Sequence, residues 1–388
     1  MIQQQKTKVL IFSVTYFPFV GGAEVALRAI TKRLPHIEFD IITAKISQKL
    51  SNLEKIDQVN VYRVGSGSKL DKYLYPLRAF LFAKKLHQQK HYNLIWSMMA
   101  TWAGIPALFF KLKFPSIKYL LTLQSGDSDL FIWLRTWFWY PLYRMIYRRA
   151  DHIQVISNWL AQRARRYGYQ GEISLVPNGV ALESFQQSAI SNQQSAIKRK
   201  LNIENNSKVI FTSSRLVKKN DIESLIKSIK FFSPNDKLQT KLIIAGSGKL
   251  EKKLKKFTQQ LNLSDKVIFL GQLTPEELLS YYAIADIFVR PSLSEGQGIS
   301  FIEAMAAGVP VIATPVGGIP DFLINDQTGW FCQVKNPESI AEKINYILND
   351  KNKLVVDKVI QNAKKMVVEK YTWNLIAEQM NQVFNKLI

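Results

Sequence analysis

Two short apolar segments with a helical segment between them constrain the fold of this chain more than any other feature. Residues 285–289 and 309–313 are apolar and rich in Val and Ile, and each is long enough to form a buried strand. Between them, residues 298–307 repeat apolar side chains at helical spacing, and Gly308 followed by Pro310 ends that helix. A strand, a helix and a strand in this order predict part of a parallel sheet, where ligands bind at the carboxyl edge of the strands.

The loop and helix of this segment carry candidate binding groups. Gly296 and Gly298 let a ligand approach the backbone, and the free amides at the start of the helix favour an anion such as a diphosphate. Glu303 is an acidic residue on an otherwise apolar helix, and Glu295 lies eight positions before it. If Glu303 is buried it needs hydrogen-bond donors, which the hydroxyl groups of a ligand would supply. An ordinary strand-helix-strand unit with a solvated glutamate explains the same pattern.

The composition indicates a globular chain with enough residues for two domains. The sequence has 388 residues, of which 47% are hydrophobic and 21% charged. It has no run of 18 uncharged apolar residues, so we expect no membrane-spanning segment. Residues 1–14 lack the layout of a signal peptide, and the single cysteine, Cys332, permits no internal disulfide. These features predict a cytoplasmic protein.

The alternation of strand-like and helical segments predicts two α/β domains. Between residues 8 and 156 the alternation predicts a doubly wound parallel sheet, and between residues 208 and 313 it predicts a second one. We therefore expect an N-terminal domain of residues 1–180, a second domain of residues 181–365 and a C-terminal helix within residues 366–388. The duplicated Gln- and Ser-rich segment at 186–197 predicts a loop just beyond the boundary.

Several other candidate residues directly follow predicted strands. Gly21 and Gly22 lie between a strand and a helix, where they serve either a ligand or a tight turn. Arg215 follows the strand at 208–212, and Lys219 lies four positions later; this pair is a plausible diphosphate clamp, because Arg offers a bidentate fork and Lys a mobile charge. Gly246 opens a Gly-Ser-Gly loop that resembles the start of a dinucleotide-binding fingerprint but lacks its third glycine.

Two aspartates follow the strand at residues 119–123. Asp127 and Asp129 have a spacing that can contribute to a divalent metal site, but two carboxylates alone do not complete one. A polar loop with an aspartate that caps a helix explains them as well. We predict no metal site and no cofactor.

Residues 131–149 have the most unusual composition in the chain. This segment contains eight aromatic residues, four arginines and no acidic residue. Trp, Tyr and Arg together favour a membrane interface with anionic lipid, although a core helix rich in aromatic residues is the alternative. The positive charge is uneven, since residues 1–180 carry 25 Lys and Arg against 10 Asp and Glu, and the remainder 27 against 20. This charge suits a basic face toward anionic lipid or nucleic acid. No nucleic-acid-binding motif accompanies the basic residues, so we do not expect nucleic acid as a partner.

Six motifs in sequence order resemble glycosyltransferase family 4. They are GGAE at 21–24, VPNGV at 176–180, SRLVKK at 214–219, IAGSGKL at 244–250, the two-glutamate segment ending in EAMAAGVPVIAT at 314, and VGGIPD at 316–321. The resemblance covers nearly the whole chain and is most specific in the second half. It implies the GT-B architecture, in which two Rossmann-like domains face each other and the C-terminal helix crosses back to the N-terminal domain. It also implies transfer of a sugar with retention of configuration and without a divalent metal.

The resemblance further implies roles for individual residues. Glu303 would hold the ribose hydroxyls, Glu295 the hydroxyls of the donor sugar, and Gly22 would close over the diphosphate from the other domain. The implied catalytic residues are Arg215, Lys219, Glu295 and Gln124, and the implied donor-binding residues are Gly21, Gly22, Arg215, Lys219, Gly246, Glu295, Gly298, Ile299 and Glu303.

Two positions depart from the family pattern. Gln124 occupies the place of a histidine near the reacting centre; its amide can hydrogen-bond a sugar hydroxyl but cannot take a proton. Asn220 occupies the place of the usual clamp lysine, five residues after Arg215, so Lys219 would have to substitute for it. Both departures affect the residue assignments more than the fold.

The sequence therefore predicts a retaining glycosyltransferase that uses a UDP- or GDP-linked sugar. The expected acceptor is a glycan or a lipid-linked molecule in surface polysaccharide or glycolipid synthesis. The expected location is the cytoplasm, with peripheral binding to an anionic membrane, on the inner face of the plasma membrane, through residues 131–149. A sugar-nucleotide epimerase of the same fold and a non-catalytic sugar-nucleotide-binding homologue are the alternatives.

Overall fold

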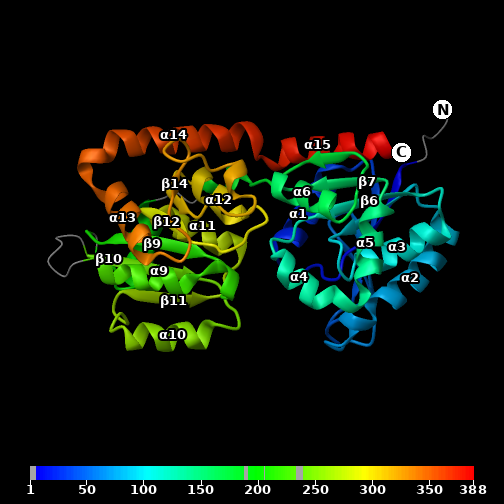
Figure 1. The fold of residues 1–388 in the computed structure, drawn as a ribbon, viewed down its shortest axis with the longest axis horizontal. Helices are drawn as coiled ribbons and strands as arrows, with labels where there is room; N and C mark the ends of the chain where they lie inside the picture. Colours follow the sequence, from blue (N-terminus) through cyan, green and yellow to red (C-terminus); the bar gives the residue numbers. More distant parts are fainter. Residues whose placement is uncertain (1–5, 188–190, 205, 233–238) are drawn as a thin grey trace. The chain divides into compact units, whose positions relative to one another are not determined.

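The chain divides into two compact units. The computed structural model describes residues 6–187, 191–204, 206–232 and 239–388; the first five residues of the N-terminus discussed above lie outside this range. Residues 1–178 and 373–388 form unit 1, and residues 179–372 form unit 2 (Figure 1). Each unit has its own sheet and its own core, and each is described by itself below.

Unit 1 contains an eight-stranded sheet. The strand order is β3-β4-β2-β1-β5-β6-β7-β8, and every neighbouring pair is parallel except β3 with β4. The strands are β1 (Lys8–Phe12), β2 (Glu38–Ala44), β3 (Leu53–Ile56), β4 (Val59–Val64), β5 (Leu94–Met98), β6 (Lys118–Leu123), β7 (His152–Val155) and β8 (Ile173–Leu175). Sequence analysis missed β3, because this short edge strand is largely exposed and lacks an apolar run.

Helices cover both faces of this sheet, and its central strands are therefore buried on both sides. The helices are α1 (Gly22–Arg33), α2 (Asp71–Lys90), α3 (Gly104–Lys113), α4 (Asp129–Thr136), η1 (Trp137–Trp139), α5 (Tyr140–Arg148), α6 (Asn158–Arg166) and α15 (Trp373–Leu387). Leu10 and Phe12 of β1 share a core with α2, α3 and α5. On the other face, α15 packs against α1, and Phe384 contacts the ring of Trp96 at a centroid distance of 5.2 Å. The C-terminal helix therefore belongs to the N-terminal unit, as the family resemblance implied.

Unit 2 contains a six-stranded parallel sheet with the order β11-β10-β9-β12-β13-β14. The strands are β9 (Lys208–Ser213), β10 (Thr240–Ala245), β11 (Val267–Gly271), β12 (Ile287–Arg290), β13 (Val311–Ala313) and β14 (Trp330–Phe331). The helices are α7 (Leu182–Gln187), α8 (Ser191–Lys200), η2 (Lys218–Asn220), α9 (Ile222–Ser228), η3 (Ile229–Phe231), α10 (Glu251–Gln260), α11 (Pro275–Ile284), α12 (Ile299–Ala306), η4 (Ile319–Asp321), α13 (Pro337–Leu348), η5 (Asp350–Asn352) and α14 (Lys353–Lys370).

The period-two alternation of the central strands separates two cores in unit 2. Ile210 of β9 points into the core that includes α9, α10 and α13, whereas Phe211 points into the core that includes α11 and α12. The two segments flanking the predicted helix are β12 and β13, and they pair in parallel as expected. Both sheets are therefore covered on two faces, which is the two-domain architecture that the family resemblance implied.

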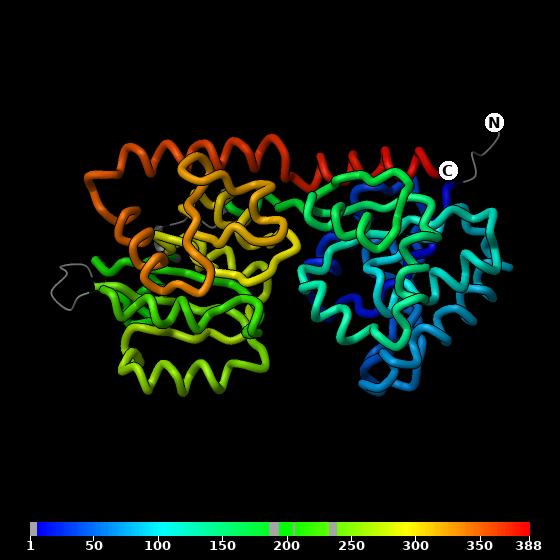
Figure 2. The backbone as a smooth tube through the Cα atoms, in the orientation of Figure 1, coloured from blue at the N-terminus to red at the C-terminus, as the bar shows by residue number. Residues whose placement is uncertain are grey.

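The boundaries differ from the expected ones by a few residues. The units divide at 178/179 and 372/373 instead of 180/181 and 365/366. Residues 366–372 stay with unit 2 because Val367 and Tyr371 are buried in its core, and α14 continues to Lys370. Figure 2 shows the resulting break between α14, in orange, and α15, in red. The expected single C-terminal helix is thus the end of one helix followed by another.

The duplicated segment at 186–197 is not the simple loop that we predicted. Residues 191–200 form α8, which packs against α11. Ala, Gln, Lys and Arg have high helix propensity, so residues that suggest a polar loop also suit a surface helix. The part of the segment at 188–190 lies outside the described residues.

Candidate active site

The candidate residues of unit 2 gather at the carboxyl edge of its sheet. Four loops leave this edge, at residues 214–221, 246–250, 291–298 and 314–318, after β9, β10, β12 and β13. The loops hold one another through their backbones: Leu293 N donates to Lys219 O at 2.6 Å, and Gly318 N donates to Glu295 O at 3.1 Å. The edge is therefore one connected structure, built where parallel sheets bind ligands.

Arg290, the last residue of β12, organises the loop that carries Glu295. It is almost fully buried, and its Nη2 donates to Glu295 Oε2 at 2.6 Å. Its Nη1 donates to Ser300 Oγ at 2.7 Å and to Ser213 O at 3.2 Å. Its guanidinium also lies over the ring of Phe301, with Cζ 4.2 Å from the centroid. One side chain thus joins β9, the 291–298 loop and the start of α12.

Sequence analysis did not assign a role to Arg290. The residue stands at the first position of the two-glutamate segment, and an arginine at the end of a buried strand, five residues before a glutamate, was an available signal. The network fixes Glu295, because Gly296 N donates to the second carboxylate oxygen at 2.9 Å. Glu295 keeps lone pairs for a ligand while two protein donors hold its orientation.

Glu303 lies on α12 beside a buried tyrosine from α11. Tyr282 Oη donates to Glu303 Oε2 at 2.8 Å and reaches Ser300 O at 3.2 Å. We expected the donors for a buried Glu303 to come from a ligand, whereas the structure supplies one of them from the protein. Burial raises the pKa of Glu303 above its ordinary value, although the Tyr282 hydrogen bond and the charge of Arg290 oppose this. The other carboxylate oxygen remains available to accept from a ligand hydroxyl.

Gly298 is required at the N-terminus of α12. Its φ is +85°, and a Cβ at this position would lie 2.5 Å from Arg290 Nη2. α12 begins at Ile299; Phe301 N donates to Gly298 O at 3.0 Å, whereas the amides of Ile299 and Ser300 precede the first hydrogen bond of the helix. Together with the helix dipole, these amides favour an anion at the sheet edge. The predicted diphosphate-binding position thus has the backbone geometry that this role needs.

The loop that carries Arg215 and Lys219 is held by Asn220. Arg215 is exposed, Lys219 is partly buried, and Asn220 is buried with its Nδ2 donating to Arg215 O at 2.7 Å. The family's clamp position therefore has a structural role here, because the amide fixes the turn of the loop. Gly246 packs under this loop: its φ is +128°, and a Cβ would lie 1.9 Å from Ser214 O.

In unit 1, Gly21 and Gly22 begin α1 after the turn that follows β1. Both are exposed, and Gly21 is the N-cap residue. A Cβ on Gly21 would lie 2.7 Å from Glu24 Oε2, whereas a Cβ on Gly22 would meet no atom within 4 Å. Glu24 is held in place by Thr15, whose Oγ1 donates to Glu24 Oε1 at 2.5 Å. Gly21 is thus constrained by the fold, and Gly22 leaves open space for a ligand.

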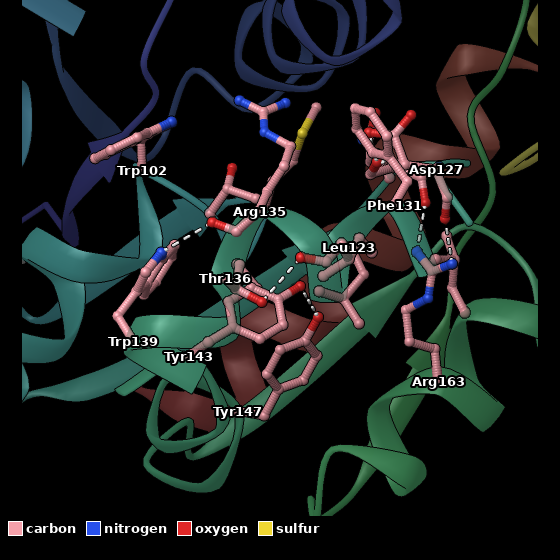
Figure 3. A pocket seen from close by; sticks show the side chains of 17 residues that line it. Trp102, Leu123, Asp127, Phe131, Arg135, Thr136, Trp139, Tyr143, Tyr147 and Arg163 are labelled. Atoms are coloured by element: carbon pink, nitrogen blue, oxygen red, sulfur yellow. Dashed lines mark hydrogen bonds between the residues drawn. The ribbon is translucent and has the colours of Figure 1, made fainter. Parts of the chain in front are cut away.

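Gln124 follows β6 and forms a reciprocal amide pair with Asn178. Gln124 Nε2 donates to Asn178 Oδ1 at 3.2 Å, and Asn178 Nδ2 donates to Gln124 Oε1 at 3.4 Å. Sequence analysis did not predict Asn178 as a partner, although it lies in the VPNGV motif. Gln124 also lines a cavity of about 150 Å³, which Figure 3 shows from close by. The amide is therefore held at the wall of a cavity in unit 1.

The two aspartates after β6 are engaged by neighbouring protein groups. Asp127 accepts from Ser125 Oγ at 3.0 Å, and Asp129 lies 2.8 Å from both Arg163 Nε and Arg166 Nη2. The N-cap of α4 is Ser128, so the capping residue lies between the two aspartates. Among the residues that the structure describes, no three His, Cys, Asp or Glu side chains gather as a metal-binding group.

The aromatic segment 131–149 divides between surface and core. Its first part, in α4 and η1, exposes large apolar side chains, whereas Tyr143, Ile146 and Tyr147 of α5 are buried. The core alternative therefore holds for the buried part of the segment, and the membrane interface stays a prediction for the exposed part. In the described part of the chain, no helix has the length and apolar character needed to cross a bilayer.

The fold and these residues define a class of protein. Two Rossmann-like units, glycine loops at the carboxyl edges of both sheets and an acidic pair beside a helix N-terminus make up the GT-B type of glycosyltransferase. Two family models match the chain: Glycosyltransferase Family 4 over residues 20–184 and Glycosyl transferases group 1 over residues 193–366. The chain belongs to the group 1 glycosyltransferases.

Similarities to known proteins are consistent with this family assignment. An uncharacterized glycosyltransferase of Methanocaldococcus jannaschii is 32% identical over 55% of this chain, and the aligned segment spans 54% of that relative, about half its length. The alpha-monoglucosyldiacylglycerol synthase of Streptococcus pneumoniae is 26% identical over 79% of this chain and 70% of its own length. The structure of Anabaena HepE in complex with UDP-glucose has 18% identity and a TM-score of 0.80, covering 98% of this chain and 99% of HepE. The first two relatives support glycosyltransferase activity, and the last one supports the fold.

Proposed function

We propose that this protein is a retaining, metal-independent glycosyltransferase that moves a sugar from a UDP- or GDP-linked donor to a lipid-linked or glycan acceptor at a membrane surface. The observation that carries the proposal is the arrangement at the sheet edge of unit 2. There Glu295 and Glu303 flank the N-terminus of α12, and the Arg215 loop is tied to the same edge through Lys219 O. A sugar nucleotide needs acceptors for its hydroxyls and positive charge for its diphosphate, and this edge offers both.

The proposed chemistry is electrostatic. The bond between the anomeric carbon and the donor phosphate breaks, and its electron pair stays on the phosphate oxygen. The acceptor hydroxyl forms the new bond from the same face and releases its proton to the departing phosphate. Arg215, Lys219 and the amides at the start of α12 stabilise the charge that develops on the diphosphate. Gln124 orients a hydroxyl group but takes no proton.

Donor binding is the first test. A panel of UDP- and GDP-sugars is added to the purified protein, and the melting temperature is measured for each. A donor that binds the folded state stabilises it by about 2.7 kcal/mol at 100 times its Kd, and so raises the melting temperature. Glu303→Gln and Arg215→Ala should lose most of this shift. The proposed donor site is refuted if no sugar nucleotide raises the melting temperature of the native chain.

Transfer is the second test. The donor found in the panel is incubated with membrane lipids, and labelled sugar is measured in the organic extract. Arg215→Ala should lower the turnover by orders of magnitude with an unchanged melting temperature, whereas near-normal turnover would contradict the role of Arg215. A parallel incubation with donor alone is the control, because an epimerase of this fold would change the sugar without an acceptor.

The membrane part of the proposal is supported by the exposed apolar face of α4 and η1. Trp137 and Phe138 are 64% and 71% exposed, and α5 continues directly from them with Arg144 and Arg148. Exposed aromatic rings followed by arginines suit the headgroup region of an anionic bilayer. The relative that synthesises a glucosyl-diacylglycerol also supports a lipid acceptor.

Flotation with anionic liposomes tests this part. The native protein should float at low salt, and the double substitution of Trp137 and Phe138 by Ser should abolish flotation. Leu354→Ser is the matched control, because Leu354 is 86% exposed but lies in unit 2. Failure of the native protein to float at low salt contradicts membrane binding.

A further inference from the structure

Unit 1 contains a partly open pocket that the donor chemistry does not use. The cavity of about 150 Å³ lies between the loops after β5 and β6, the helices α4 and α5, and α6. In Figure 3 the rings of Trp102, Trp139 and Tyr143 lie around it, with Phe131 on another side. Apolar cavities of roughly this size bind molecules such as benzene in proteins.

Several polar groups in the cavity wall are already hydrogen-bonded to the protein. Tyr143 and Tyr147 bond each other through their hydroxyls at 2.9 Å, and Thr136 Oγ1 donates to Ile132 O at 2.9 Å. Trp139 Nε1 donates to Arg135 O at 3.2 Å. Groups paired in this way offer little to the hydroxyls of a sugar, so the inner wall presents mainly hydrocarbon to an occupant.

Arg163 forms one side of the cavity, and its polar groups are also paired with protein atoms. It is almost fully buried, and its Nη1 and Nη2 donate to the backbone oxygens of Ser125 and Asp127. Its Nε lies 2.8 Å from the Asp129 carboxylate, so its charge is paired. Arg163 therefore holds the loop that carries Gln124 and Asp127 and leaves no free charge directed into the cavity.

The opposite wall has an unusual backbone. Met99, directly after β5, has φ of +72°, in the left-handed region that residues with a Cβ rarely adopt. The following residues, Ala100 to Trp102, all line the cavity. Backbone strain of this kind is typical of functional sites. The strained residue therefore lies next to the part of the wall formed by Ala100 to Trp102.

The cavity opens beside the exposed apolar surface. Phe131 is half exposed at its rim, and Arg135 is exposed with its guanidinium 5.4 Å from that ring. Trp102 contacts Trp139 of η1 and Tyr73 of α2, at centroid distances of 6.2 Å and 5.6 Å. Next to Tyr73, leucines at helical spacing are exposed on α2 and at its N-cap. They are Leu74, Leu77 and Leu81 of the helix and Leu70, the N-cap residue. Exposed apolar side chains of α2, α4 and η1 thus adjoin the mouth.

We propose that this cavity binds the hydrocarbon segment next to the polar head of a lipid acceptor, so that the acceptor is an amphiphile and not a free glycan. The inference rests on the proposed function and names its acceptor class. A chain that leaves the bilayer beside α4 would reach the cavity past the exposed apolar side chains of α4 and η1. Gln124 lines the same cavity, so a chain seated there brings the acceptor's head group to the residue that orients its hydroxyl.

The test uses small probes that separate hydrocarbon from sugar. Binding of n-alkanols from butanol to octanol and of methyl glucoside is measured by calorimetry on the native full-length protein. Each additional buried methylene should increase the affinity roughly fourfold, the equivalent of about 0.8 kcal/mol, until the cavity is filled. Methyl glucoside should not bind at this position.

Two variants connect the binding to the cavity. Thr136→Leu adds volume inside it, and Thr136→Val is the matched control that removes the hydroxyl with little change in size. The filled variant should fold with an unchanged or higher melting temperature and bind octanol at least tenfold more weakly, and Thr136→Val should bind it like the native protein. Ala100→Val, on the opposite wall, is a second filling variant and should behave like Thr136→Leu.

Each outcome decides the proposal. Equal octanol binding by the native protein and both filled variants, or binding of methyl glucoside without octanol, overturns it. A higher KM for a lipid acceptor in the filled variant, with the donor KM unchanged, supports it further. Failure of the proposed function is recognisable separately: sugar nucleotides would then give no thermal shift, while octanol binding and its loss in the filled variants would persist.

Discussion

Replacement of Arg290 by methionine tests the network that holds the two-glutamate segment. Methionine keeps the apolar stem of the side chain but removes every donor of the guanidinium. Glu295 would then lose its ionic partner at 2.6 Å, and Ser213 O and Ser300 Oγ would lose donors at 3.2 Å and 2.7 Å. We expect the sheet edge of unit 2 to be destabilised without a large change in packing.

The size of the expected loss of stability follows from the burial of Arg290 and Glu295. Removal of one partner of a fully buried ion pair costs about 3–5 kcal/mol. The Glu295 side chain is 16% exposed and can regain some water, so its share is reduced to about 2 kcal/mol. The two lost hydrogen bonds add about 1 kcal/mol in total. We therefore expect a loss of about 3 kcal/mol in the free energy of unfolding of unit 2. For a unit of this size, that loss corresponds to a fall of about 6–12 °C in the melting temperature.

Calorimetry and urea unfolding of the native and variant proteins provide the assay. The control is Arg28→Met, which makes the same chemical change at an exposed pair, because Arg28 is 43% exposed and lies 2.7 Å from Asp57. This control should lose less than about 1 kcal/mol. The double variant Arg290→Met with Glu295→Gln should lose less than the two single changes combined, with a coupling of about 1–3 kcal/mol. Equal losses at Arg290 and Arg28, or additive losses in the double variant, would refute the reasoning.

Three further predictions concern the same edge. Burial raises the pKa of Glu303, and ligand hydroxyls donate best to its ionised form. Donor affinity, measured by calorimetry, should therefore fall by up to about tenfold per pH unit below that pKa. The Glu303→Gln variant should show no such dependence on pH. Gly246→Ala forces a Cβ to within 1.9 Å of Ser214 O at a φ of +128°, so urea unfolding should show a loss of at least about 1–3 kcal/mol; an unchanged midpoint would exclude this close approach. Asn220→Ala removes the hydrogen bond to Arg215 O, and should cost about 1 kcal/mol in stability and raise the donor KM; an unchanged KM would show that the loop does not depend on this amide.

The strands and helices of the central sheets could be predicted from local patterns because burial on both faces leaves a clear apolar run. β9 and β12 and the helix between β12 and β13 lie within a few residues of their predicted ranges. The exposed edge strand β3 and the helix α8 have no comparable pattern, and both were missed. A polar segment can form a loop, an edge strand or a surface helix, and tertiary contacts decide among them.

The candidate site was found only in part for a similar reason. Glu295, Glu303 and Gly298 belong to one continuous segment, so their spacing is visible in the sequence. Tyr282 and Asn178 lie on other elements, 21 residues from Glu303 and 54 residues from Gln124, and reach their partners only through the fold. Local sequence patterns do not predict hydrogen bonds between residues so far apart in the chain.

The sequence by itself determined the two-domain α/β architecture, the family and the segment on which the two glutamates lie, because each of these depends on local spacing or on motif order. Tertiary structure alone decided what surrounds those glutamates. The orientation of Glu295 depends on Arg290 reaching across β9 and α12, and the raised pKa of Glu303 depends on its burial beside Tyr282. The cavity beside Gln124 likewise exists only where three helices and two loops meet. Electrostatics and cavity shape depend on distances in space, and folding brings together residues that the sequence keeps far apart.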